Sequence, residues 1–151
     1  MKISIREQPT TVDSPTGPVL VRPYQIVVSV NLVVGDVLSP SFPAILDTGH
    51  SHNFSISEEQ LRSWANMKLP TSRVIRVNGR PVPIAAADLV LDGMRLHLPE
   101  GIAVFPMGHP GLTRIPLVGL RALVRNNMRV DIHGKRRQVS ITRAWRPWWQ
   151  R

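Results

Sequence analysis

The stretch that decides the fold is Phe42-Pro43-Ala44-Ile45-Leu46-Asp47-Thr48-Gly49, a short apolar run that ends in an acidic tripeptide. The run predicts a buried strand that delivers Asp47 into a turn at Gly49. Burial penalises the charged form of a carboxylate, so an aspartate here is costly unless it is hydrogen-bonded or used in chemistry. Asp and Gly are also ordinary turn residues, so the tripeptide by itself favours a surface turn.

Chemistry offers a reason for this placement. The glycine lets backbone N–H groups approach the Asp47 carboxylate, and the Thr48 hydroxyl can hydrogen-bond beneath it. Two such carboxylates brought together share one proton, because like charges at close range cannot both ionise. The ionised carboxylate can then take a proton from water, while the protonated one polarises a scissile carbonyl.

The rest of the chain is divided into short segments by fourteen prolines and ten glycines, which is typical of an all-β domain. Ser57 and Gln60 form a capping-box pattern that predicts a helix start, and Leu120, Leu123 and Val124 have the spacing of a second short helix. Strands are expected at residues 24–34, 88–91, 94–98 and 102–105, with a closing hairpin at 129–132 and 138–142.

A hairpin is expected around Asn78-Gly79, the strongest two-residue signal for a type I′ turn. Its second strand contains Pro81 and Pro83, which cannot donate hydrogen bonds to a neighbouring strand. The hairpin is therefore predicted to project from the body of the domain.

The composition indicates one folded domain, with 42% hydrophobic residues and no cysteine for disulfides or thiolate metal sites. The N-terminus lacks an apolar core of signal-peptide length, and the longest apolar stretch, residues 24–35, is far short of a membrane span. We expect a cytoplasmic protein with no transmembrane segment. The net charge of +9 comes mostly from arginines scattered along the chain, and by itself it does not identify a binding partner.

The segment Ala44-Ile45-Leu46-Asp47-Thr48-Gly49-His50-Ser51-His52-Asn53-Phe54-Ser55-Ile56-Ser57 closely resembles the catalytic segment of retropepsin-like aspartic proteases. Ile115-Pro116-Leu117-Val118-Gly119-Leu120-Arg121-Ala122-Leu123 is similar to the family's apolar-apolar-Gly element, which crosses behind the catalytic loop and opens the C-terminal helix. The Asn78-Gly79 hairpin falls where the family has its substrate-covering flap, and residues 126–141 resemble the closing hairpin. The resemblance covers residues 20–142 in the family's order.

This resemblance implies an all-β, single-domain retropepsin-like acid-protease barrel with a flap hairpin and one short C-terminal helix. The domain would span residues 19–143, preceded by an N-terminal strand and flexible lead-in at 1–18 and followed by a basic, Trp-rich tail at 144–151. In particular, residues 8–18 are expected to be a loop or flexible lead-in.

The resemblance also assigns roles. Asp47 matches the catalytic aspartate, Thr48 the residue whose hydroxyl interlocks with the other subunit, and Gly49 the glycine that faces substrate. Asn78 and Gly79 would lie at the flap tip. Because the chain has a single Asp-Thr-Gly, the implied enzyme is a homodimer with two-fold symmetry. Terminal strands help to join such dimers, and residues 1–6 and 138–142 are the candidates here.

His50 departs from the family pattern, which has alanine or serine beside the catalytic aspartate. A protonated His50 would favour ionised Asp47 and narrow the substrate channel; alternatively, the ring points away and packs under the flap. His50 and His52 form a His-x-His, but His52 belongs to the family's ordinary run, so no metal site is expected and no cofactor is implied. His97, His109 and His133 are expected to be surface or loop histidines.

Residues 135–151 combine arginines with three tryptophans. This pattern can bind single-stranded nucleic acid or an anionic membrane surface; packing of the tryptophans on the barrel or dimer is the favoured alternative, so a nucleic-acid partner is not expected.

The function implied is an aspartic endopeptidase that hydrolyses peptide bonds in extended polypeptide segments. The alternatives are an inactive retropepsin-fold module for dimerisation or peptide binding, and a nucleic-acid-binding protein acting through the basic tail.

Overall fold

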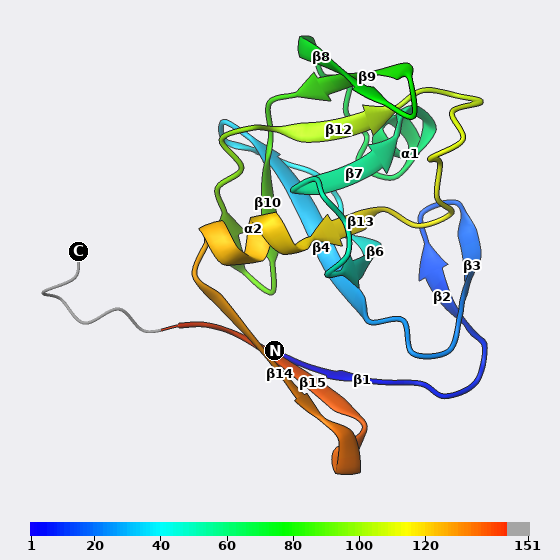
Figure 1. Ribbon diagram of the computed structural model, residues 1–151, viewed down its shortest axis with the longest axis vertical. Coiled ribbons are helices and arrows are strands. Elements are labelled where there is room, and N and C mark those ends of the chain that lie inside the picture. The colour runs from blue at the N-terminus through cyan, green and yellow to red at the C-terminus, as the bar shows by residue number, and fades with distance from the viewer. Residues whose placement is uncertain (145–151) are drawn as a thin grey trace, which may run out of the picture.

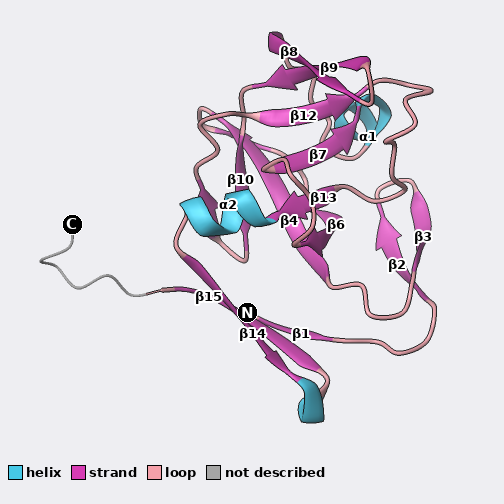
Figure 2. Ribbon diagram, viewed as in Figure 1, coloured by secondary structure: helices cyan, strands magenta, loops and turns pink. Residues whose placement is uncertain are grey.

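The computed structural model describes residues 1–144 of the 151. Within these residues the chain forms fifteen strands, two short α-helices and one 3-10 turn (Figures 1 and 2). The fold class is all-β, as the sequence predicted. Nearly all of the tail expected at 144–151 lies outside the described residues, so its role stays a prediction.

A single path of hydrogen-bonded strands forms most of the body, in the order β11-β10-β4-β6-β13-β7-β12-β9-β8, with β5 added beside β4. Among the described residues β11 and β8 are not paired with each other, so the path is open at its ends. Its strands are β4 Val27–Val34, β5 Val37–Leu38, β6 Phe42–Asp47, β7 Phe54–Ser57, β8 Thr71–Val77, β9 Arg80–Ala85, β10 Asp88–Leu91, β11 Met94–Leu96, β12 Ile102–Phe105 and β13 Leu117–Gly119.

The two helices lie where the sequence predicts them. Helix α1 (Glu58–Ser63) begins at Ser57, whose hydroxyl accepts the Gln60 N–H, while the Gln60 side chain accepts the Ser57 N–H. Helix α2 (Leu120–Arg125) follows β13 directly. Neither helix is long and apolar enough to cross a membrane, which holds for every helix in the described part of the chain.

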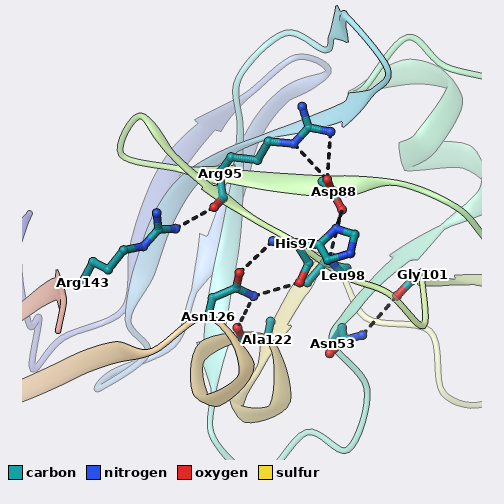
Figure 3. Close-up of polar contacts among 9 residues, drawn as sticks. All are labelled: Asn53, Asp88, Arg95, His97, Leu98, Gly101, Ala122, Asn126 and Arg143. Carbon is teal, nitrogen blue, oxygen red and sulfur yellow. Dashed lines mark hydrogen bonds and ion pairs between the residues drawn. The ribbon is translucent and has the colours of Figure 1, made fainter. Parts of the chain in front are cut away.

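The end of α2 is fixed by the Asn126 side chain (Figure 3). Its amide nitrogen donates to the carbonyl oxygens of Ala122 and His97, and its oxygen accepts the His97 N–H. The His97 ring contacts the Asp88 carboxylate, which also accepts from Arg95. This exposed network joins α2 to the segment after β11.

The hydrophobic core lies between the strands of the main path and under α1. Its largest fully buried side chains include Phe42, Phe54, Leu32 and Ile56. The Phe42 ring packs at tilted angles against Phe54 and Trp64, with ring centroids 6.3 and 6.4 Å apart. The apolar run of β6 is therefore buried, as predicted, and only Asp47 at its end emerges toward solvent.

The prediction of a flexible lead-in at residues 8–18 is wrong, because this segment folds into a hairpin. Strands β2 (Thr10–Ser14) and β3 (Gly17–Val21) pair antiparallel. Val12 and Val19 pack against a small core cluster that contains Val21, Ile45 and Ile115. The prolines and glycine suggested a loop, but Pro9 precedes β2, Pro15 lies in the turn, and Gly17 and Pro18 start β3, where a strand tolerates them.

The two ends of the chain pair with each other. Strands β1 (Lys2–Ser4), β15 (Gln138–Arg143) and β14 (Met128–His133) form a separate sheet in the order β1-β15-β14. The β14–β15 hairpin, closed by a 3-10 turn at Gly134–Arg136, extends away from the body (Figure 1). The strands that the resemblance implied as dimer contacts are thus already paired within one chain, and no strand of residues 1–144 pairs with the outer edges of β1 and β14.

Strand β13 crosses behind the Asp47 turn. It lies between β6, to which it is parallel, and β7, to which it is antiparallel. At its end the Gly119 N–H donates to the Asn53 carbonyl at 2.9 Å. A Cβ atom at Gly119 would lie 1.8 Å from the His52 carbonyl oxygen, so glycine is required by close approach of two backbones.

We therefore expect Gly119→Ala to destabilise the protein by about 3 kcal/mol or more, because the clash is with backbone that cannot rotate away. Gly134→Ala is the matched control, since a Cβ there meets nothing within 4 Å. Denaturant unfolding of both variants measures the effect. Equal stability of Gly119→Ala and Gly134→Ala would contradict this account of the crossing.

Candidate active site

Asp47 ends β6 and its carboxylate caps the turn that follows. The Gly49 N–H donates to Asp47 Oδ1 at 3.0 Å, and the His50 N–H donates to the Asp47 carbonyl at 3.1 Å. Asp47 is half-buried, whereas Thr48 and Gly49 are exposed. Within residues 1–144, no hydrogen bond reaches Asp47 Oδ2 or the Thr48 hydroxyl, so both groups remain available to a ligand or a second chain.

One side of the carboxylate faces a hollow of about 370 Å³, here called the Asp47 hollow. Its wall includes Ile45 and Leu117 from the paired strands β6 and β13. Arg22 and Arg114 also line it, so positive charge borders the space beside Asp47.

The β8–β9 hairpin forms the predicted projecting flap. Asn78 and Gly79 have φ values of 52° and 73°, the positive values that a type I′ turn requires. Strand β9 pairs with β12 only through Ile84 and Ala85, so the remainder of the hairpin extends beyond the sheet. Pro81 and Pro83 lie in this extended part, as the sequence predicts.

A row of aromatic rings connects the Asp47 turn to the flap. The rings pack edge-on in sequence, from His50 to His52, then to Phe105 and then to His109. The distances between successive ring centroids are 5.2, 6.2 and 4.9 Å. Edge-to-face packing of this kind holds rings in defined orientations. Local sequence patterns do not reveal this row, because its members come from segments far apart in the chain.

His109 lies in the loop after β12, as expected, but it is buried rather than at the surface, since the residue is 4% exposed. Its Nδ1 accepts the Gly111 N–H at 2.9 Å, so the proton lies on Nε2, which donates to the Val77 carbonyl at 3.1 Å. His109 therefore ties the loop after β12 to the end of β8, next to the flap tip. No spacing with other histidines could have indicated this role.

His50 turns toward β7, where its Nε2 pairs with the Ser55 hydroxyl. Burial lowers the pKa of His50, His52 lowers it further, and Asp47 opposes both by raising it. The ring is therefore uncharged at neutral pH, and the predicted effect of a protonated His50 on Asp47 is confined to acid pH. Burial, and then the Arg121 charge, also lower the pKa of His52.

Asn53 contributes a buried polar atom that lacks a partner. The side chain is 3% exposed, and its amide nitrogen donates to the Gly101 carbonyl at 3.5 Å (Figure 3). Its Oδ1 is the one buried side-chain atom without a hydrogen bond in the described part of the chain. Such an atom is costly when unpaired. Over the same residues there is no cluster of three or more His, Asp or Glu side chains placed to hold a metal ion.

No protein-family model matches the sequence. No curated protein matches it either. Among solved structures, the chain is similar to a retropepsin-like aspartic protease from Rickettsia conorii, with a TM-score of 0.43 and 16% identity over 92% of this chain and 86% of that chain. This likeness is distant, and we therefore infer function from the residues around Asp47.

The paired histidines give stability a pH dependence. The folded pKa values of His50 and His52 lie below the ordinary value of 6.5, so the unfolded chain binds more protons as the pH falls below 6.5. Above this pH both rings are neutral and can be buried without a charge. This contribution to the free energy of unfolding is lost as the pH falls through the lowered pKa values. We expect the free energy of unfolding to fall as the pH drops below about 6.5, and to fall less in the double variant His50→Gln, His52→Gln.

Denaturant titrations at several pH values measure this slope. His133→Gln, which changes an exposed histidine on β14, is the control and is expected to keep the wild-type slope. Identical slopes in the wild type and the double variant would contradict the assignment.

Proposed function

We propose that this chain is an aspartic endopeptidase whose active site forms when two copies pair. The observation that carries the proposal is the half-buried Asp47 carboxylate, held by the Gly49 N–H on a turn that β13 supports from behind. The flap hairpin adds a second element that could cover a substrate.

The two Asp47 carboxylates have different tasks in this mechanism. The Asp47 carboxylates of two copies share one proton, because both cannot be ionised at close range. The ionised carboxylate removes a proton from a water molecule as the oxygen attacks the peptide carbonyl, and the protonated carboxylate hydrogen-bonds to the carbonyl oxygen. The proton then passes to the leaving nitrogen, and the two carboxylates return to their shared state without a covalent intermediate.

Pairing of two copies is needed because one chain supplies a single carboxylate on an Asp-Thr-Gly turn. The exposed Thr48 hydroxyl is free to bond to a second chain, as the resemblance implies. A two-fold axis beside Asp47 would bring the same turn from both copies together. The open edges of β1 and β14 offer further backbone groups for the contact.

Asn78 and Gly79 at the flap tip would cover the bound substrate. A flap that closes over a bound peptide excludes water other than the attacking molecule and holds the peptide extended. His50, which lies directly after the Asp47 turn, would border the same channel.

We expect purified protein to cleave unstructured peptides in a library assayed from about pH 3.5 to 7.5, with specific activity that rises with protein concentration. Asp47→Asn is expected to lower kcat/KM by about a thousand-fold or more, since an amide can neither accept the proton of water nor share one. Asp36→Asn, in an exposed turn before β5, is the matched control and should keep full activity.

Cleavage that survives in Asp47→Asn would contradict the proposal. Folded, dimeric protein with no cleavage at any pH would favour the alternative of a peptide-binding module with the same fold.

A further inference from the structure

A second hollow lies between the segment that follows the Asp47 turn and strand β8 of the flap. It has a volume of about 210 Å³ and is called here the Arg73 hollow. Its wall is formed by residues 51–53, which follow the Asp47 turn, by Arg73 and Ile75 of β8, and by Glu100 and Arg121. The space exceeds that of several water molecules at about 30 Å³ each, so it accommodates one long side chain.

Three guanidinium groups surround one carboxylate at this hollow. Arg121 and Arg125 of α2 contact Glu100 at 2.7 and 2.6 Å. The Arg121 hydrogen bond lowers the pKa of Glu100, and the charges of Arg121, Arg125 and Arg73 act in the same direction. Glu100 is thus fully engaged by α2, and the cluster keeps an excess of positive charge.

Within residues 1–144, Arg73 is the member of this cluster without a carboxylate partner. Its recorded contact is a long one, from Nη2 to the Glu100 backbone carbonyl at 3.5 Å. Side chains alternate along a strand, so Arg73, Ile75 and Val77 share the inner face of β8 while Arg76 points to the opposite face. Ile75 and Val77 pack against the cluster of Val82, Ile84, Ala103 and Phe105, which confirms that this face is the inner one.

The flap as a whole carries an excess of positive charge. Residues 71–85 contain Arg73, Arg76 and Arg80 but no Asp or Glu. Among the described residues none of the three has a carboxylate within 4.0 Å. Arg76 and Arg80 instead donate to the carbonyl oxygens of Gly79 and Gly108, which hold the charges in place without cancelling them.

We propose that the Arg73 hollow binds an acidic side chain of the polypeptide held under the flap, so that the preferred substrates are segments with Asp or Glu near the scissile bond. The inference rests on the proposed function, because it requires a peptide between the flap and the Asp47 turn. Arg73 receives the carboxylate through the fork of its guanidinium, whose geometry matches a carboxylate. The aliphatic wall formed by Ile75 and Ile84 contacts the methylene groups.

The test uses one cleaved peptide in three versions, which carry Glu, Gln or Lys in turn at each position flanking the scissile bond. We expect one position at which the wild type prefers Glu over Gln by about five-fold in kcat/KM, with Lys poorest. Arg73→Glu is expected to reverse this order, so that Lys becomes the best residue at the same position. The wild-type preference should weaken as salt is raised, because the contact is partly exposed.

Arg76→Glu is the matched control, since it makes the same change of charge on the same strand but on the outer face. It should leave the order Glu, Gln, Lys unchanged. An equal effect of Arg76→Glu and Arg73→Glu would assign the preference to the general charge of the flap and overturn the inference. Equal rates for all three peptides at every position would overturn it as well. If Arg73→Glu does not fold, Arg73→Gln serves instead and is expected to abolish the preference without reversing it.

Binding separates this inference from the proposed function. Fluorescence anisotropy of labelled Glu, Gln and Lys peptides with the Asp47→Asn protein measures selection without cleavage. Tighter binding of the Glu peptide, lost in Asp47→Asn with Arg73→Glu, supports the hollow even if the wild type cleaves nothing. Cleavage without any such difference in binding or rate retains the proposed function and removes the acidic preference.

Discussion

The contact on which the rest depends is the crossing of β13 behind the Asp47 turn, where the Gly119 N–H meets the Asn53 carbonyl at 2.9 Å. At this point two backbones are so close that a Cβ atom would overlap the His52 carbonyl oxygen. The crossing fixes the turn from behind, leads directly into α2, and so places Arg121 beside the loop that follows Asp47. The position of the carboxylate and the charge of the Arg73 hollow therefore have the same origin.

Local sequence signals predicted the elements whose geometry depends on a few adjacent residues. Ser57 and Gln60 defined the start of α1, and Asn78-Gly79 defined the flap turn, because capping and positive φ are decided within one turn of chain. The hairpin at β2 and β3 escaped prediction because its stability comes from Val12 and Val19 packing on Ile45 and Ile115, contacts that no local pattern reveals.

In the candidate site too, adjacent residues could be predicted from the sequence and long-range contacts could not. Asp47, Thr48 and Gly49 could be found from the sequence because they are adjacent in a recognisable motif. The buried His109, the row of rings from His50, and the cluster of Arg73, Arg121 and Glu100 each combine segments separated by many residues. These residues meet because of the order of the strands in the sheet. The spacing of residue types along the chain does not reveal that order.

Under the proposed function, in which two copies pair to form the active site, the pairing of β1 with β15 has a consequence for the control of activity. Because the two terminal strands satisfy each other within one chain, a single copy keeps its secondary structure when it separates from a partner. The protein would thus persist as folded, inactive monomers that become active when they pair. A threshold would follow, since the population of pairs grows with the square of monomer concentration while pairs are scarce.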